Sequence, residues 1–447
     1  MLPRAALALA ALVPSRGQTP QSPQTPQRVA RFGIITDVHY ADYQTVGTRH
    51  YRDSLPKVER ATRDIIAAEA DFMIELGDFK DTVCPADNKG TVPANCTDKT
   101  LGFIDTIEGA MAAFKGPRFH VLGNHDVDIL NQSAVLSHVH NYGDGGLQAE
   151  GHYSFSMPFP RAANGSGGGA GPDTAGCLIT DAPAGSNVWV MHDDGTRNWI
   201  SKPTSGCLSK ATAEPDDTIN AIPKRHGANS PLYALDAAQS AAACANHACT
   251  KLPGAVPAAL KFIVLNGDFN GAGQAWYDLD GSPQLPFVWD DAYVSTTQME
   301  WLAEELDAAK SAGQKAIVFV HYRLDGGPAG PVDCGPDTPC GKAKNRAWVD
   351  DCTLKNAAVV RDILESSGVV LATFSGHDHV PIPPSTVNNG VLYFTHSGLV
   401  EGPISSSNAY STVDVLSDCT ISIRGFANAT TLRHPGAAGC SLPIPPK

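Results

Sequence analysis

Five short motifs in this chain carry side chains that commonly bind metal ions. They are Asp37-Val38-His39, Gly77-Asp78, Gly123-Asn124-His125-Asp126, an isolated His321, and Gly376-His377-Asp378-His379. Aspartate, asparagine and histidine together offer oxygen and nitrogen ligands, a mixture that suits Mn, Fe or Zn better than Ca, which prefers oxygen alone. We therefore predict seven metal ligands: Asp37, His39, Asp78, Asn124, His321, His377 and His379.

Seven ligands exceed the needs of one four- to six-coordinate ion, so we predict two ions about 3.5–4 Å apart. Asp78 is the natural bridge between them because its carboxylate has two oxygens. Such a pair can bind a phosphate and convert a bound water to hydroxide, which attacks phosphorus in line with the leaving oxygen. His125 stands beside a predicted ligand and could protonate that oxygen, and Asp126 could orient His125. The motifs therefore predict a phosphoesterase.

Each motif follows an apolar segment that is typical of a buried β-strand. These segments are residues 32–36, 72–76, 118–122, 316–320 and 369–375. In open α/β sheets, ligands bind at the carboxyl ends of the strands, so the motifs should meet at one edge. Helical periodicity is found over residues 54–66, 101–114 and 354–364, and a capping box at Thr297 predicts another helix ending near Gly313. The alternation of strands and helices indicates an α/β class with βαβ connections.

Composition excludes some classes of function. The formal net charge of −13 argues against binding of a nucleic-acid polymer, which needs a basic surface. A small anionic, phosphorylated substrate would need a local positive site, which metal ions could supply. No stretch is long and apolar enough to predict a transmembrane segment. The sequence gives no signal for an oligomeric state.

The first residues predict export. A charged start and a short apolar stretch over residues 1–17 are typical of a signal peptide, with a disordered or transit-type leader as the alternative. Residues 18–28 form a Pro/Gln-rich linker. The chain has eleven cysteines, and Cys84 with Cys96, Cys244 with Cys249 and Cys334 with Cys340 are plausible local disulfides. Four Asn-x-Ser/Thr sequons matter only after export: Asn95, Asn131, Asn164 and Asn428.

The remaining chain divides into a domain, an insertion and a tail. Residues of about 160–258 are rich in Ala, Gly, Pro and Cys and show little periodicity, which predicts an insertion containing disulfides. We place this insertion within one large domain at 29–430, followed by a C-terminal tail at 431–447.

The five motifs, in this order and spacing, resemble the calcineurin-like metallophosphoesterase superfamily from about residue 32 to residue 424. The resemblance implies a four-layer αββα sandwich. It also implies that Asp37, His39, Asp78 and His379 hold one ion and that Asp78, Asn124, His321 and His377 hold the other. By the same resemblance, His125 protonates the leaving group.

Residues 32–42, 49–54 and 407–410, with Glu401, are more narrowly similar to the manganese-dependent ADP-ribose/CDP-alcohol diphosphatases. That family often has Gln at the position of His39. Residues 376–380 are equally similar to purple-acid-phosphatase-like proteins. We therefore keep three functions: a hydrolase of nucleotide-type diphosphates, a secreted phosphomonoesterase of broad specificity that scavenges phosphate, and a catalytically inactive binding protein. The last predicts a missing ligand, and none of the expected ligands is missing.

A further group of side chains could contact a phosphate or stack on a base, with ordinary rim positions as the alternative. These residues are Tyr51, Arg52, Tyr322, Arg323 and Glu401. Gly267-Asp268 resembles the Gly77-Asp78 motif, but nothing else near it matches, so we interpret Asp268 as structural, with lining of a pocket as the alternative.

Overall fold

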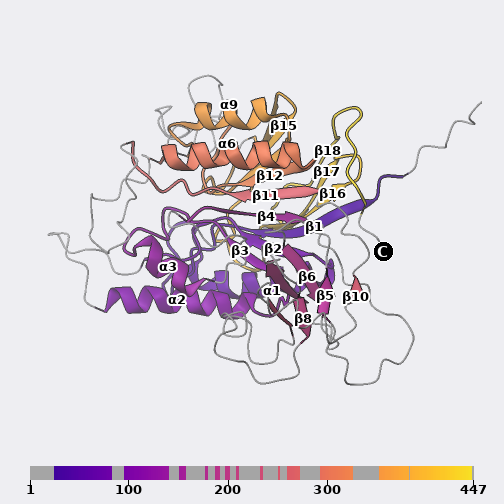
Figure 1. The fold of residues 1–447 in the computed structure, drawn as a ribbon. Helices are drawn as coiled ribbons and strands as arrows, with labels where there is room; N and C mark the ends of the chain where they lie inside the picture. The colour runs from indigo at the N-terminus through magenta and orange to yellow at the C-terminus, as the bar shows by residue number, and fades with distance from the viewer. Residues whose placement is uncertain are drawn as a thin grey trace, which may run out of the picture.

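The computed structural model describes residues 25–82, 95–139, 151–157, 259–271, 292–325, 352–381 and 383–444, together with short strands between residues 177 and 251. Two six-stranded sheets pack face to face, and helices cover the outer face of each sheet (Figure 1). The predicted four-layer αββα sandwich is confirmed.

The first sheet has the strand order β18-β17-β16-β1-β2-β3. β1 pairs in parallel with β2, and β2 with β3, whereas β16, β17 and β18 are antiparallel to their neighbours. Helices α1 and α2 cover its outer face (Figure 1). The bounds are β1 Arg28–Ile35, η1 Tyr51–Asp53, α1 Ser54–Ala67, β2 Phe72–Glu75, α2 Cys96–Met111, β3 Arg118–His120, α3 Gln132–His138, β16 Tyr410–Leu416, β17 Ile421–Phe426 and β18 Leu432–His434.

The second sheet has the strand order β14-β15-β13-β12-β11-β4. β11, β12, β13 and β15 run parallel, and the edge strands β4 and β14 are antiparallel. Helices α6 and α9 cover its outer face (Figure 1). The bounds are β4 Tyr153–Met157, β11 Leu260–Val264, α6 Thr296–Ser311, β12 Lys315–Phe319, α9 Ala357–Ser367, β13 Val370–Ser375, β14 Ser385–Asn388 and β15 Val391–Thr395.

Alternation along the strands builds the core between the two sheets. Phe32 and Ile34 of β1 point into this core, where Phe32 stacks on Phe72 with ring centroids 4.9 Å apart. The intervening Gly33 faces α1, and a Cβ there would lie 2.5 Å from Cδ1 of Ile65. Glycine therefore lets the helix lie directly on the sheet.

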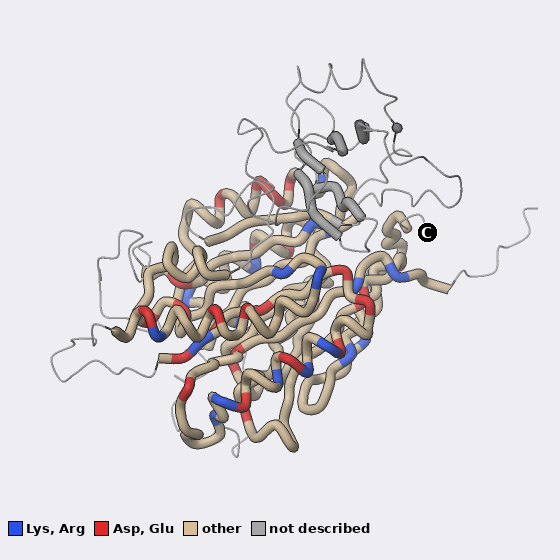
Figure 2. The backbone as a smooth tube through the Cα atoms, turned by 90° about the horizontal axis from the view of Figure 1, so that it is seen from below, with Lys and Arg blue, Asp and Glu red and all other residues tan. Residues whose placement is uncertain are grey.

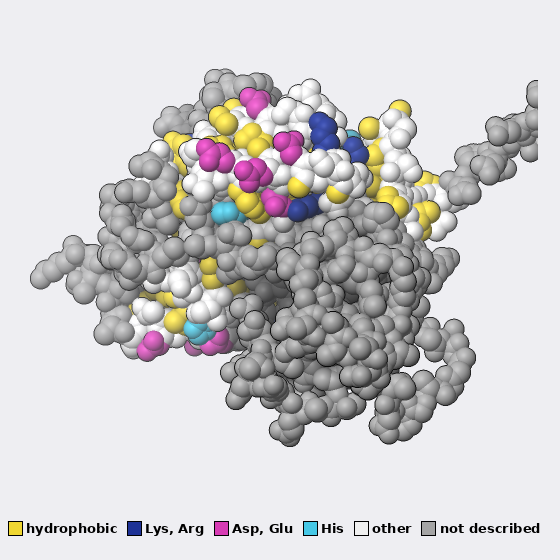
Figure 3. Space-filling view, viewed as in Figure 1, with side chains coloured by type: hydrophobic (Ala, Val, Ile, Leu, Met, Phe, Trp, Pro, Cys, Tyr) yellow, Lys and Arg dark blue, Asp and Glu magenta, His cyan; other side chains and the backbone are white. Residues whose placement is uncertain are grey.

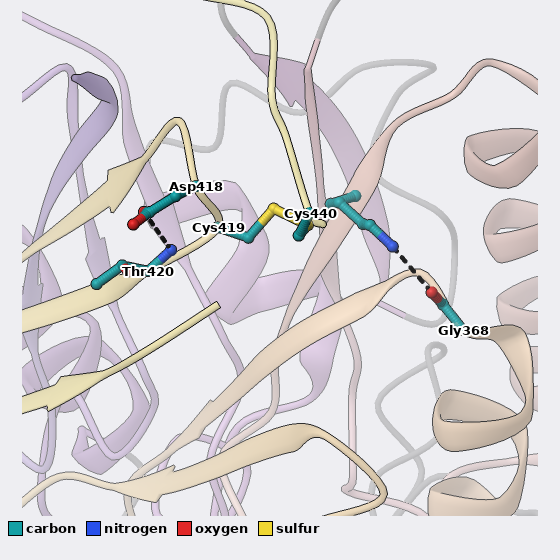
Figure 4. The surroundings of a disulfide bond; sticks show 6 residues. Gly368, Asp418, Cys419, Thr420 and Cys440 are labelled. Carbon is teal, nitrogen blue, oxygen red and sulfur yellow. Dashed lines mark hydrogen bonds between the residues drawn. A yellow bond between two sulfur atoms is a disulfide. The ribbon is translucent and has the colours of Figure 1, made fainter. Parts of the chain in front are cut away.

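The structure corrects two boundaries. Helix α6 is capped by Ser295, whose hydroxyl accepts a hydrogen bond from the N–H of Gln298 at 3.2 Å, and not by Thr297. The predicted tail belongs to the domain up to residue 444, because β18 pairs with β17 and Leu442 is buried in the core between the sheets. A disulfide between Cys419 and Cys440 joins this segment to the first sheet (Figure 4).

The insertion contains short strands, whose side chains lie outside the described residues. β10, β5, β8 and β9 form one sheet and β6 pairs with β7. Their bounds are β5 Cys177–Ile179, β6 Asn187–Met191, β7 Arg197–Ser201, β8 Leu208–Lys210, β9 Leu232–Ala234 and β10 Thr250–Lys251. Cys96 is disulfide-bonded, whereas its expected partner Cys84 and the other two expected pairs lie outside the described residues.

The described surface agrees with the acidic composition. Glu300, Glu304 and Asp307 are exposed on α6, and acidic side chains gather over this helix in the space-filling view (Figure 3). Seen from below, the positions of basic and acidic residues are interspersed along the described backbone (Figure 2). No helix within the described ranges is long and apolar enough to cross a membrane.

Candidate metal centre

All seven predicted ligands converge on one edge of the sandwich. Asp37 and His39 follow β1, Asp78 follows β2 and Asn124 follows β3, so four come from the first sheet. The second sheet supplies His321 after β12, and His377 and His379 after β13. This is the arrangement expected where the carboxyl ends of parallel strands meet.

One group of ligand atoms forms around His39. Its Nε2 lies 3.0 Å from Nε2 of His379 and 3.9 Å from Oδ1 of Asp37. Oδ1 of Asp37 lies 3.3 Å from Nε2 of His379. Asp78 reaches the same group, with its Oδ2 3.4 Å from Nε2 of His39.

A second group forms around His321. Its Nε2 lies 3.2 Å from Oδ1 of Asn124 and 3.2 Å from Nδ1 of His377. Oδ2 of Asp78 lies 3.2 Å from the same Nε2. The Asp78 carboxylate therefore stands between the two groups, in the place expected for a ligand shared by two ions.

The hydrogen bonds behind the rings show that these groups fit metal ions. Nδ1 of His321 lies 2.8 Å from the carbonyl oxygen of Leu76, and Nδ1 of His379 lies 2.6 Å from Oε1 of Glu401. Both Nδ1 atoms must donate there, so each Nε2 directs a lone pair at other acceptors. Lone pairs and carboxylates that converge in this way can bind a metal ion in place of protons, and each group matches the oxygen and nitrogen set of Mn, Fe or Zn.

The turns that carry the ligands have an unusual backbone. Asp37, His39, Asp78 and His377 have φ angles of 51°, 44°, 60° and 64°, in the left-handed region that side chains other than glycine rarely adopt. Such conformations persist only where the surrounding structure fixes them, and they cluster at functional sites. Gly123 permits the close approach of the turns after β2 and β3, since a Cβ would lie 2.4 Å from the amide nitrogen of Asp78.

Charge in the centre is strongly coupled. Burial alone would raise the pKa of Asp37 and Asp78, but the neighbouring imidazoles outweigh it and hold both pKa values below their usual range. Burial likewise opposes protonation of His321 and His379, yet the carboxylates raise their pKa values to about 10 and about 9. The carboxylates therefore demand positive charge at this site, which metal ions can provide.

His125 lies beside these groups with a quarter of its side chain exposed. Its backbone N–H donates to Oδ1 of Asp78 at 2.7 Å, and its ring packs edge to face against the ring of His39. Nδ1 lies 3.6 Å from Oδ1 of Asp81 and 3.8 Å from Oδ2 of Asp128. Burial lowers the pKa of His125, but the Asp78 and Asp81 carboxylates outweigh it and raise this pKa.

Asp126 does not lie where the sequence placed it. Its carboxylate accepts hydrogen bonds from the N–H groups of Asp78, Phe79 and Gly123, each at 2.9 Å. The carboxylates that face Nδ1 of His125 belong to Asp81 and Asp128 instead. Asp126 therefore joins the turn after β2 to the turn after β3, and the orientation of His125 falls to other residues.

The predicted substrate contacts of Tyr322 and Arg323 are contradicted by their burial. Tyr322 has no exposed surface and donates its hydroxyl to Oδ1 of Asp268 at 2.7 Å. Arg323 is 2% exposed, and its guanidinium binds the carboxylates of Asp325 and Asp378. Both side chains therefore make buried contacts within the protein next to the ligands. Asp268, interpreted from the sequence as structural, is fully buried and accepts the hydrogen bond of Tyr322.

The other three candidates differ from one another. Arg52 binds Asp42 on the surface at 2.6 Å. Glu401 accepts the hydrogen bond of His379, which makes it a support for a ligand. Tyr51 is half-buried, and burial together with the nearby Asp81 charge raises its pKa.

Sequence reasoning missed Asp81, Asp128 and Arg49. Nδ1 of His39 lies 3.3 Å from Oδ2 of Asp81, and Nη1 of Arg49 lies 3.6 Å from the same oxygen. Arg49 leaves 34% of its side chain exposed, so it brings a partly free positive charge to the rim. Asp81 follows the Gly77-Asp78 motif by three residues, a spacing that could have marked it.

Residues 30–233 match the family of calcineurin-like phosphoesterases. Two relatives are manganese-dependent ADP-ribose/CDP-alcohol diphosphatases. The one from Arabidopsis thaliana is 29% identical over 116 residues, 25% of this chain and 34% of the relative. The one from Oryza sativa subsp. japonica is 32% identical over 112 residues, 24% of this chain and 32% of the relative. The chain thus spans about a third of the length of these relatives.

One solved structure is similar over nearly the whole chain. The crystal structure of a dimetal phosphatase from Danio rerio covers 92% of this chain and 100% of its own, with a TM-score of 0.54 and 16% identity. At that identity the likeness shows the fold. It agrees with the two-sheet sandwich described above.

We expect Asp126→Ala to destabilise the protein by about 3 kcal/mol or more, because three buried N–H groups lose their acceptor together. Urea unfolding measures this loss. Asp414→Ala is the matched control, since Asp414 binds Arg31 at a partly exposed position and should cost about 1 kcal/mol or less. Equal stability of Asp126→Ala and the wild type would contradict the role of Asp126 in joining the two turns.

Proposed function

We propose that this protein is a metal-dependent phosphoesterase acting on nucleotide-type diphosphates such as ADP-ribose or CDP-alcohols, a proposal supported by the match of residues 30–233 to the calcineurin-like phosphoesterases. The observation that carries the proposal is the pair of ligand groups that share Asp78. The diphosphate substrate is supported by the relatives, which are named for that activity. Manganese is the metal we propose, on the same support.

The two ligand groups would hold two divalent ions, which polarise phosphoryl oxygens and lower the pKa of bound water. Around them, this chain supplies the groups that move protons and bind charge. His125 is partly exposed and its raised pKa keeps a proton available for the leaving oxygen. Asp81 and Asp128 face its Nδ1, which leaves Nε2 as the nitrogen that would protonate the leaving oxygen.

Arg49 lies at the rim next to Asp81, and Tyr51 lies near the Asp81 charge. An arginine guanidinium binds phosphate oxygens well, and a second phosphate on the substrate would give Arg49 a partner. This favours a diphosphate over a monoester. The second candidate, a phosphomonoesterase of broad specificity, is favoured by His39, which completes one ligand group where the diphosphatases often carry Gln.

A substrate panel separates the two candidates. We expect kcat/KM for ADP-ribose and CDP-choline to exceed that for nitrophenyl phosphate by about tenfold or more, with Mn as the most effective metal, because binding the second phosphate adds transition-state stabilisation. Rates are measured with Mn, Zn, Mg and Ca in turn, with Asp78→Ala as the inactive control. A nitrophenyl monoester as the fastest substrate would favour the phosphomonoesterase.

We expect His125→Asn to slow substrates with poor leaving groups about 10²–10⁴-fold and to slow nitrophenyl esters much less, because only poor leaving groups need a proton.

The same assignment predicts a pH effect in Asp128→Asn. Removing this negative charge lowers the pKa of His125, so the basic limb of the kcat/KM profile should move to lower pH. Equal slowing of both ester classes, or an unmoved limb, would contradict His125 as the acid.

We also propose that the protein is exported. The Cys419–Cys440 disulfide supports this, since such bonds persist mainly in oxidising compartments. Expression in a secreting host should yield a chain in the medium that begins near residue 18, as read by N-terminal sequencing. An intracellular chain that retains Met1 would contradict export.

A further inference from the structure

Lys57 of α1 is a buried cation. Among the described residues, no carboxylate lies within ion-pair distance of its ammonium group. Its side chain has no exposed surface. Its ammonium donates to the carbonyl oxygens of Leu399 at 2.8 Å, Glu401 at 3.0 Å and Gly402 at 2.6 Å. A lysine has three N–H donors, so all of them are spent on one short segment of chain.

This segment, residues 399–402, lies directly behind the metal centre. The N–H of Leu399 donates to the carbonyl of Thr36, and the N–H of Val400 donates to the carbonyl of Asp37, both at 3.0 Å. Glu401 extends from the same segment and accepts the Nδ1–H of His379 at 2.6 Å. The segment therefore contacts the turn after β1 through its backbone and the turn after β13 through Glu401.

Lys57 holds the segment from the helix side. From the opposite side, the N–H of Gly402 donates to the carbonyl of Thr48, and the carbonyl of Val400 accepts the N–H of His50. A methionine of similar length would fill the same space without burying a charge, and buried ions are often replaceable by apolar groups at no loss of stability. What lysine adds is a fixed position for three carbonyl groups.

We propose that Lys57 is a positioning residue for the metal centre. Its ammonium fixes residues 399–402 so that Glu401 accepts the Nδ1–H of His379. The ring of His379 then presents Nε2 to Asp37 and His39. Carboxylates that orient a ligating histidine in this way typically change metal affinity 10–100-fold when they are lost. The inference rests on the proposed dinuclear hydrolase and adds a residue that touches neither metal nor substrate.

The test compares manganese binding by isothermal titration in the full-length chain. We expect Lys57→Met to weaken one of two sites about 10–100-fold and to leave the other within about twofold. Ile65→Ala is the matched control, because it removes a buried side chain of the same helix that packs against Gly33 rather than residues 399–402. This control should lower stability and leave both affinities unchanged.

A double-mutant cycle shows whether Lys57 acts through Glu401. We expect Lys57→Met combined with Glu401→Gln to bind manganese no more weakly than the weaker single variant, because both remove the same support. If the affinity loss of the double variant equals the product of the two single losses, Lys57 acts independently of Glu401, and the proposal is overturned. If Lys57→Met does not fold, Lys57→Gln takes its place in the cycle.

Failure of the inference can be told apart from failure of the proposed function. If the wild type binds two ions and Lys57→Met binds them equally well, only the role of Lys57 is refuted. If the wild type binds no divalent metal, the proposed function fails. In that case, ¹⁵N NMR of labelled histidine still decides the role of Lys57: loss of the His379 Nδ1–H hydrogen bond in Lys57→Met supports it, and an unchanged signal overturns it.

Discussion

The structure depends on one electrostatic constraint. Ring nitrogens and carboxylate oxygens of the ligand residues lie close together at the edge where the turns of the two sheets meet. Ring nitrogens and carboxylate oxygens approach one another to between 3.0 and 3.4 Å around His39 and His321. Such contacts are favourable only when a proton or a metal ion lies between the two atoms. The carboxylates raise the pKa of His321 and His379 in answer to the same demand, since protons and metal ions neutralise the same charge.

The fold meets this constraint by holding the ligand turns rigidly. Asp126 joins the turns after β2 and β3 through three backbone N–H groups, and Arg323 holds the turn after β13 through Asp378. Lys57 fixes the segment that supports His379. Four ligands keep left-handed backbone angles, and these supports offset the strain. Polar side chains buried around the centre therefore serve to position it.

The strands and the ligands could be predicted from the sequence because each motif directly follows its own apolar segment. The supports could not, because their partners lie far away along the chain. Lys57 and Leu399 are 342 residues apart, and no sequence pattern around either residue predicts their contact. Tyr322 and Arg323 misled for the opposite reason: polar residues beside a ligand suggest substrate contact, yet both are buried. The tail misled because β18 is only three residues long.

Anomalous diffraction from crystals grown with manganese tests the central claim most directly. The account predicts two peaks in each molecule, one among Asp37, His39 and His379 and one among Asp78, His321 and His377. The Asp78 carboxylate should contact both. A single peak, or two peaks without Asp78 between them, would contradict the shared centre on which the proposed chemistry depends.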